Sequence, residues 1–132
     1  MVKILVIDDE TDVCEFTKSF FKKRGFEVFT STSGEKGISI AQEMKPDIVL
    51  LDIIMKDIDG ITVLKRIKEI GSSAIVIMVT AIDDIGKMEE AKKLGAVAYL
   101  TKPLILAELE RKITGLAQEI SKRDKNYAST NI

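Results

Sequence analysis

Short apolar runs between longer amphipathic segments constrain the fold of this chain more than any other feature of its sequence. Four of the runs are continuous and rich in valine and isoleucine, and a weaker one lies second along the chain. They occupy residues 4–7, 26–29, 47–51, 74–79 and 96–100. Runs that are apolar at every position are typical of strands buried on both faces of a sheet. We therefore predict five short strands in the interior of the molecule.

The segments between these runs carry apolar residues at helical spacing. One example is Val13, Phe16 and Phe20, and a second comprises Ile61, Leu64 and Ile67. Each set forms one apolar stripe along a helix. Strands that alternate with helices in this way favour right-handed crossovers and a parallel sheet covered by helices on both faces. The pattern predicts a doubly wound α/β domain.

Turn and cap residues support these boundaries. Gly25 and Gly95 follow helical patterns as C-terminal caps do, and Asp59 with Gly60 marks a turn before the next helix. Residues 32–35 (TSGE) form a pattern typical of a capping box. A glycine-containing Ser/Thr loop could instead bind a phosphate, as in flavin-mononucleotide proteins, but this loop follows the second strand and lacks phosphate-loop spacing. We favour the cap.

The last helical segment, beyond Pro103, has a stripe of apolar residues. Its members are Leu106, Leu109, Ile113, Leu116 and Ile120. The early part of the stripe must pack on the sheet, whereas Leu116 and Ile120 could extend past the body as a dimer contact or linker. Core packing is favoured because the sustained heptads of a coiled coil are missing.

The length and charge of the chain limit its organisation and its partners. A chain of 132 residues suffices for one core, and we predict one domain over residues 1–120 and a polar, aperiodic tail over residues 121–132, frayed or starting a linker. Lys and Arg number 20 against 21 Asp and Glu, so the formal net charge is −1. Without a basic surplus, direct binding of nucleic acid or of an anionic membrane is not expected.

The rare residues point to a reducing compartment and limit the chemistry. A single cysteine, Cys14, cannot form an internal disulfide and lies in an apolar helical pattern typical of a buried, inert thiol. The apolar run at the N-terminus is too short for a signal peptide or a membrane span. We therefore expect a cytoplasmic protein. The chain has no histidine, so any phosphohistidine must come from a partner.

Charged and polar residues stand at the predicted carboxyl ends of four strands. Asp8 and Asp9 follow the first strand, Asp52 the third, Thr80 ends the fourth, and Lys102 follows the fifth. Each alone has a structural explanation as a cap, strand or turn residue. In a doubly wound sheet, however, they meet at one edge, where crowded carboxylates repel one another unless a cation neutralises them. Oxygen donors without histidine suit Mg²⁺ and phosphoryl transfer.

Four separated motifs resemble those of the receiver domains of two-component response regulators. They lie at residues 4–10 (ILVIDDE), 48–52 (IVLLD), 79–81 (VTA) and 99–103 (YLTKP). A lone Asp pair is weak evidence, but four motifs in order at strand ends are specific. The resemblance covers about residues 3 to 120. It implies a flavodoxin-like (βα)5 fold with a five-stranded parallel sheet in the order 2-1-3-4-5.

The resemblance also implies roles for the residues at this edge. Asp52 is expected to accept a phosphoryl group from a phosphohistidine of a sensor histidine kinase or phosphotransfer protein. Asp8 and Asp9 are expected to hold Mg²⁺ with Asp52 and the backbone carbonyl of Ile54, and Asp9 to be the more direct ligand. Lys102 is expected to pair with the phosphoryl oxygens, and a cis peptide bond is expected to follow it.

The same resemblance implies a switch rather than an enzyme acting on a separate substrate. Thr80 is expected to hydrogen-bond the phosphoryl group and Tyr99 to turn inward behind it. The readout surface is then the fourth helix, the fifth strand and the fifth helix, about residues 84–115, which could also form a homodimer. The chain would catalyse only its own phosphorylation and self-dephosphorylation.

Four positions depart from the family pattern. Lys56 stands where receivers commonly have proline, which puts the geometry of that loop in question. Ile54 and Ile82 stand where polar side chains often orient an attacking water, so we predict slow self-dephosphorylation. Leu104 replaces an aromatic residue, which we interpret as a minor change in the core.

Two other functions compete with the phosphoacceptor. A haloacid-dehalogenase-like phosphatase also uses an aspartate at a strand end, but it requires a second aspartate where this chain has Ile54. A binding module that signals without phosphorylation would have lost the acidic cluster, Thr80 or Lys102, and all are present.

Overall fold

The computed structural model describes the backbone of residues 1–130 and the side chains of residues 1–122. Within these residues five strands alternate with five helices. In chain order they are β1 (Lys3–Ile7), α1 (Thr11–Lys22), β2 (Glu27–Ser31), α2 (Gly34–Met44), β3 (Ile48–Leu51), α3 (Gly60–Glu69), β4 (Ile75–Thr80), α4 (Ile85–Lys93), β5 (Ala98–Thr101) and α5 (Leu106–Thr130). All five predicted strands are present, and each begins within two residues of its apolar run.

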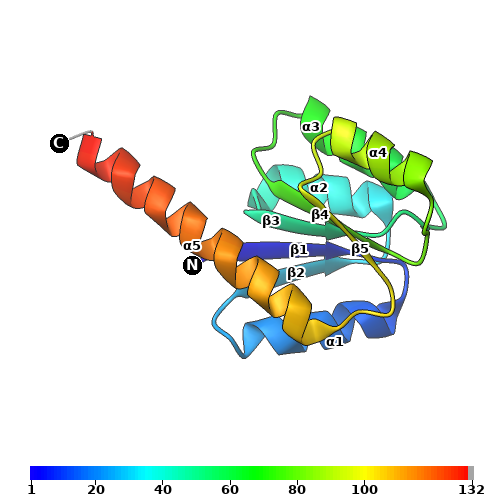
Figure 1. Cartoon of the computed structure of the whole chain (residues 1–132), viewed down its shortest axis with the longest axis horizontal. Coiled ribbons are helices and arrows are strands. Elements are labelled where there is room, and N and C mark those ends of the chain that lie inside the picture. Colours follow the sequence, from blue (N-terminus) through cyan, green and yellow to red (C-terminus); the bar gives the residue numbers. More distant parts are fainter. Residues whose placement is uncertain (131–132) are drawn as a thin grey trace.

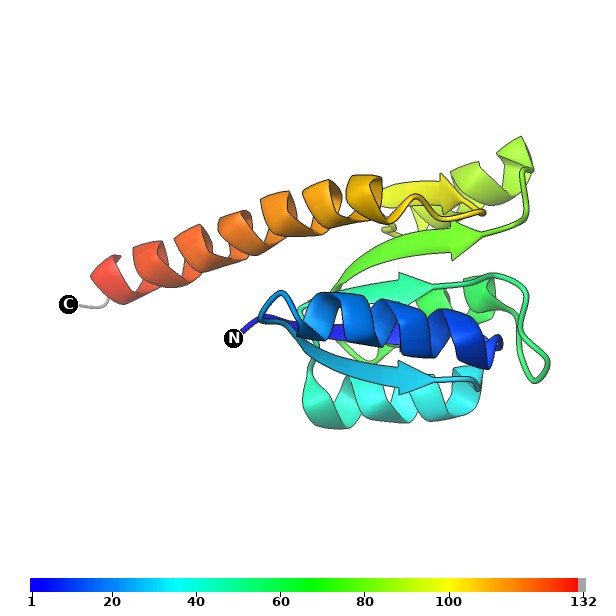
Figure 2. The ribbon, with the colours of Figure 1, turned by 90° about the horizontal axis from the view of Figure 1, so that it is seen from below.

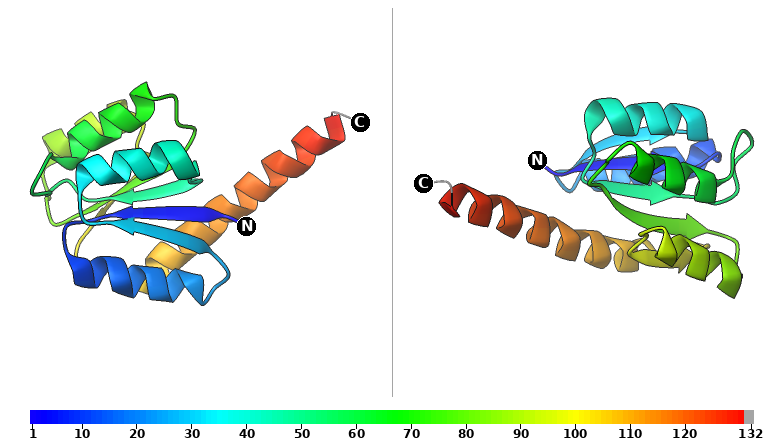
Figure 3. Two further views of the ribbon diagram at one scale, coloured as in Figure 1. Left: turned by 180° about the vertical axis from the view of Figure 1, so that it is seen from behind. Right: turned by 90° about the horizontal axis from the view of Figure 1, so that it is seen from above.

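The strands form one parallel sheet in the order β2-β1-β3-β4-β5. Helices α1 and α5 cover one face of the sheet, and α2, α3 and α4 cover the other (Figure 1). The arrowheads of the strands all point away from the free end of α5 (Figure 3). The predicted doubly wound, flavodoxin-like architecture is confirmed.

Burial on both faces of the sheet explains the continuous apolar runs. In β1, Leu5 and Ile7 pack toward α2, α3 and α4, whereas Ile4 and Val6 pack toward α1 and α5. All four side chains are buried. Successive residues of a strand point to opposite faces, so a strand between two helical layers must be apolar at every position.

The glycine caps are confirmed, and residues 32–35 cap α2 as predicted, but the reciprocal bond from Glu35 that defines a capping box is not formed. Gly25 and Gly95 have φ angles of +89° and +104°, a left-handed conformation that favours glycine. At α2 the N-cap is Ser33, whose Oγ accepts a hydrogen bond from the amide of Lys36 at 3.3 Å. Glu35 does not reach back to the cap, because its carboxylate pairs with Arg66 at 2.7 Å. The carboxylate of Asp57 instead accepts hydrogen bonds from the first amides of α2.

Helix α5 is longer than the sequence predicted. Its helical backbone continues to Thr130, where a frayed tail was expected from residue 121. It projects from the body on the side of the N-terminus (Figure 2). Leu116 and Ile120 pack on the apolar layer between α1, α5 and the sheet, which confirms core packing for both. The domain limit at residue 120 and the linker stay predictions, and residues 131–132 of that tail lie outside the described residues.

Among the described residues, no helix combines the length and the apolar character needed to span a membrane.

Candidate functional site

Backbone hydrogen bonds align the predicted site residues at the carboxyl edge of the sheet. The amide of Asp8 donates to the Ser31 carbonyl at 3.0 Å, and the amide of Asp52 donates to the Ile7 carbonyl at 3.0 Å. The amide of Lys102 donates to the Thr80 carbonyl at 2.8 Å. The strand pairing therefore continues into the first polar residues, which brings side chains from β1, β3 and β5 into one pocket.

The centre of this pocket is an ammonium group shared by three carboxylates. Lys102 Nζ lies 2.7 Å from Asp8 Oδ2, 2.9 Å from Asp52 Oδ2 and 3.2 Å from Glu10 Oε1. The side chains of Asp8 and Asp52 are each only 4% exposed, whereas Glu10 lies at the rim. The peptide bond between Lys102 and Pro103 is cis, as expected from the resemblance.

Burial makes the charges of this pocket costly. Burial raises the pKa of Asp8 above its ordinary value, although the hydrogen bond from Lys102 opposes this shift. Burial alone would lower the pKa of Lys102, but its hydrogen bonds to Asp8 and Asp52 outweigh this effect and raise it. Lys102 is therefore charged at neutral pH. Two buried carboxylates share one ammonium, so the pocket favours a further cation.

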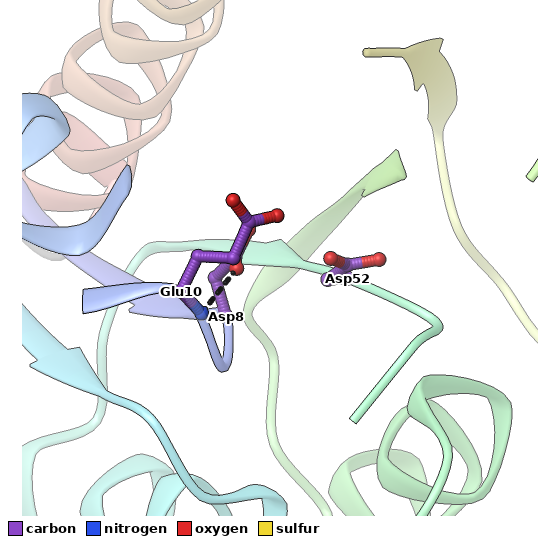
Figure 4. A group of neighbouring side chains, drawn as sticks. All are labelled: Asp8, Glu10 and Asp52. Atoms are coloured by element: carbon purple, nitrogen blue, oxygen red, sulfur yellow. Dashed lines mark hydrogen bonds between the residues drawn. The ribbon is translucent and has the colours of Figure 1, made fainter. Parts of the chain in front are cut away.

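The donor atoms of the pocket fit a hard divalent ion. One carboxylate oxygen from each of Asp8, Glu10 and Asp52 lies within 4.8 Å of the others. Figure 4 shows Asp8 and Glu10 side by side, across from Asp52. Carboxylate oxygens at a partly open site, without nitrogen or sulfur donors in the cluster, suit Mg²⁺.

The predicted ligand Asp9 is not part of this cluster in the described residues, and Glu10 is. The Glu10 amide donates to Asp8 Oδ1 at 2.9 Å, which turns the chain so that the Glu10 side chain lies beside Asp8 (Figure 4). Asp9 is half-buried. Its role as a direct ligand stays a prediction. In the sequence Glu10 stands out only as part of a motif, and no local signal indicates its contact with Lys102, 92 positions away.

The loop between β3 and α3 folds back on the phosphoacceptor candidate. Asp52 Oδ1 accepts a hydrogen bond from the Ile54 amide at 3.1 Å. The Gly60 amide donates to the Ile53 carbonyl at 2.8 Å. A Cβ atom at Gly60 would lie only 1.9 Å from the Asp52 carbonyl oxygen, so this position requires glycine. As predicted, Asp59 precedes a helix: its Oδ1 caps α3 by accepting from Ile61 and Thr62.

The two predicted switch residues are connected through Ile82. The Ile82 amide donates to Thr80 Oγ1 at 3.3 Å, and the Tyr99 hydroxyl donates to the Ile82 carbonyl at 2.8 Å. Thr80 is fully buried, and Tyr99 is half-buried, which raises the pKa of its hydroxyl. A displacement of Thr80 would therefore disturb the contact that holds Tyr99. Their roles in switching stay predictions.

Cys14 lies beneath the pocket as a buried thiol. Its Sγ donates to the Asp8 carbonyl at 3.2 Å, and burial raises the pKa of the thiol to about 11. A thiol that stays protonated at neutral pH is a poor nucleophile. This agrees with the predicted structural role.

The sequence matches the model of one protein family over most of its length. That family is described as the response regulator receiver domain, and the match covers residues 4–114. The chain is 35% identical to sporulation initiation phosphotransferase F of Bacillus subtilis over 81% of this chain and 86% of that protein. It is 33% identical to the probable transcriptional regulator ycf27 of Cyanophora paradoxa over 98% of this chain and 54% of that protein. The chain thus spans about half the length of the ycf27 relatives.

Solved structures agree with this match. A CheY-like receiver domain protein of Methanospirillum hungatei is similar with a TM-score of 0.88 and 26% identity, over 93% of this chain and 98% of that one. The CheX-CheY-BeF3-Mg complex of Borrelia burgdorferi contains a similar chain, with a TM-score of 0.82, 29% identity and coverage of 87% and 88%.

Proposed function

Since this chain belongs to the family of response regulator receiver domains, we propose that it accepts a phosphoryl group on Asp52 and switches state when it does. One observation carries the proposal. The Asp52 carboxylate lies at the carboxyl edge of the sheet, with Lys102 2.9 Å from it and two further carboxylates around the same ammonium. A nucleophile, a fixed cation and oxygen ligands for a metal are the parts that phosphoryl transfer requires.

The proposed reaction transfers the phosphoryl group from a partner's phosphohistidine. An Asp52 carboxylate oxygen attacks phosphorus, an O–P bond forms as the P–N bond breaks, and the imidazole leaves with the electron pair. Lys102 stays charged and moves its contact from Asp52 Oδ2 to the phosphoryl oxygens. Asp8, Asp9, Asp52 and the Ile54 carbonyl would hold Mg²⁺, as the resemblance implies. When bound, Mg²⁺ stabilises charge on the transferring phosphoryl oxygens.

The donor would be a sensor histidine kinase or a phosphotransfer protein. The chain has no histidine to carry the phosphoryl group itself. The B. subtilis relative is named a phosphotransferase, and the B. burgdorferi neighbour forms a complex with CheX. We propose the cytoplasm as the compartment, since a single buried cysteine suits a reducing environment.

The proposed readout is the face formed by α4, β5 and α5. A hydrogen bond from Thr80 to the phosphoryl group would break its contact with the Ile82 amide and so disturb the bond between Ile82 and Tyr99. Tyr99 lines a groove of about 670 Å³ between α4 and β5. The groove is also lined by Ile85 and Val97, which are 74% and 54% exposed. An effector or a second copy of the chain could bind there. Direct binding of nucleic acid is not proposed, because the net charge is −1.

We also propose that self-dephosphorylation is slow and that the chain is not an enzyme toward other substrates. The Ile54 side chain is 50% exposed beside Asp52, and Ile82 is half-buried. Neither can orient a water molecule for attack on the acyl phosphate. A lifetime of seconds for phospho-Asp52, without a phosphatase, would contradict this.

The decisive experiment uses acetyl phosphate as the donor. We expect intact mass spectrometry to show one phosphoryl addition that requires Mg²⁺ and is absent in Asp52→Asn. Failure of the wild type to gain a phosphoryl group from acetyl phosphate or from an amidophosphate, together with no measurable Mg²⁺ binding, would favour a module that signals without phosphorylation.

A further inference from the structure

The loop over residues 52–60 is fastened to the start of α2 by Asp57. This side chain is exposed, yet it accepts three hydrogen bonds: from Ser33 Oγ at 2.8 Å, the Gly34 amide at 3.0 Å and the Glu35 amide at 3.0 Å. The bonds from the Glu35 and Gly34 amides and from Ser33 hold the pKa of Asp57 well below its usual range. The carboxylate is therefore ionised at neutral pH, and it lies at the positive end of the helix dipole.

An apolar contact fastens the same part of the loop. Ile58 packs directly on Gly34, where an added Cβ atom would lie 2.7 Å from Ile58 Cγ1. The same atom would lie 2.9 Å from Val63 Cγ2 of α3. Two neighbouring loop residues thus contact the start of α2: Asp57 through hydrogen bonds and Ile58 through apolar packing. A loop held in both ways has little freedom to shift along the helix.

The fastened tip is close in sequence to the reacting carboxylate. The amide of Ile54, three residues before Asp57, donates to Asp52 Oδ1. The far end of the loop is closed by the Gly60 amide on the Ile53 carbonyl. Residues 54–56 therefore connect the base of the loop, closed by the bond between Gly60 and Ile53, to its tip at Asp57, held on α2. Lys56, the central residue of the loop over residues 52–60, is exposed and lacks the restriction on φ that proline would impose.

We propose that Asp57 is a positioning residue for the phosphoacceptor site. By holding the tip of the loop on α2, it fixes the Ile54 backbone, both the amide that bonds Asp52 and the carbonyl expected to bind Mg²⁺. The part of the inference that concerns Mg²⁺ rests on the proposed function. The same contacts compensate for Lys56, because the hydrogen bonds from the start of α2 to Asp57 restrict the loop where receivers commonly have a proline.

A purely structural role has different consequences. If Asp57 only capped α2, its loss would lower the thermal stability of the protein. In the folded protein, exchange of the Ile54 and Gly60 amides and the affinity for Mg²⁺ would then be unchanged. A matched control is available in Asp84, an exposed aspartate that caps α4 by accepting from the Lys87 amide at 3.0 Å. Asp84→Ala removes one helix cap and leaves the loop over residues 52–60 intact.

The first measurement is amide hydrogen exchange in the metal-free protein. We expect the Ile54 and Gly60 amides to exchange about tenfold faster in Asp57→Ala than in the wild type, since local opening of the loop becomes easier. Asp57→Asn keeps one acceptor oxygen and should lie between them. Asp84→Ala should leave both amides as in the wild type. Equal exchange in Asp57→Ala and the wild type would overturn the fastening.

The second measurement is the Mg²⁺ dissociation constant by titration calorimetry at a temperature where all variants are folded. Groups that orient metal ligands typically change affinity by 10–100-fold, and Asp57 acts one step further away, so we expect about a threefold to tenfold increase in Asp57→Ala. Asp84→Ala should show none. Equal affinity in both variants overturns the positioning role. If the wild type itself binds no Mg²⁺, the proposed function fails, and the exchange rates still decide whether Asp57 fastens the loop.

Discussion

Aspartates at the two edges of the sheet have different partners: a neutral backbone amide at one edge and a shared ammonium group at the other. At the amino edge, the Asp47 carboxylate accepts a hydrogen bond from the Lys3 amide at 2.8 Å. The Lys3 carbonyl accepts in turn from the Asp47 amide at 2.9 Å. At the carboxyl edge, Asp8 and Asp52 are buried and share the single ammonium of Lys102. A carboxylate satisfied by a backbone amide of the neighbouring strand serves the fold. Buried carboxylates that outnumber the ammonium groups around them favour a further cation.

The largest effect should come from removing the shared cation. Lys102→Met leaves two buried carboxylates unpaired, and we expect the metal-free protein to lose about 3 kcal/mol of unfolding free energy at pH 7. Urea denaturation would measure this. Saturating Mg²⁺ should restore part of the loss. Lys87→Met, at an exposed pair with 4.0 Å between Lys87 Nζ and Glu90 Oε2, is the control with almost no expected change. Equal effects of the two substitutions would contradict the claim that the buried carboxylates at the carboxyl edge depend on Lys102.

The next effect concerns metal binding and stability together. Asp8→Asn removes one buried charge, so the metal-free protein should melt at a higher temperature, while Mg²⁺ affinity falls at least about tenfold. Calorimetry measures both quantities.

The difference in stability between the wild type and Asp8→Asn should depend on pH with a defined sign. Because the pKa of Asp8 is raised in the folded state, the wild type gains stability relative to Asp8→Asn as the pH falls through that pKa. A stability difference that does not change with pH would contradict a raised pKa.

A smaller effect is expected at the amino edge. Asp47→Ala removes the acceptor for the half-buried Lys3 amide, and we expect a loss of about 1 kcal/mol in unfolding free energy. Mg²⁺ affinity and phosphoryl acceptance from acetyl phosphate should match the wild type. A changed Mg²⁺ affinity would mean that the two edges are coupled, and the comparison would no longer hold.

The smallest effect on stability is expected at Asp57, and its dependence on pH has the opposite sign to that of Asp8. Its pKa is lowered in the folded state, so it stabilises the protein above about pH 4, the ordinary aspartate value, and this stabilisation is lost as the pH falls through its folded pKa. The melting temperature of Asp57→Asn should therefore lie below that of the wild type at pH 7 and approach it in acid. A difference that grows in acid would show that the carboxylate is not held by its donors.

Local patterns in the sequence determined the elements and most of the site. Continuous apolar runs predict strands buried on both faces, and the polar residue after each run predicts what reaches the edge, as for Asp8, Asp52 and Lys102. Strand ends were less certain: β2 includes Ser31, beyond its apolar run, because pairing with Ile7 of β1 extends it. The strand order came from the family resemblance, since apolar periodicity does not distinguish neighbours in a sheet.

Only the tertiary structure decided which carboxylates meet which donors. Glu10 contacts Lys102 across 92 positions of the chain, and Asp57 caps a helix that begins 23 positions earlier. Glu35 stands in the capping pattern yet pairs with Arg66, 31 positions away. The sequence by itself determined the fold class and the chemistry of the strand ends, because apolar periodicity and strand direction are local properties. The partners of exposed carboxylates depend on how the loops pack, which no local pattern records.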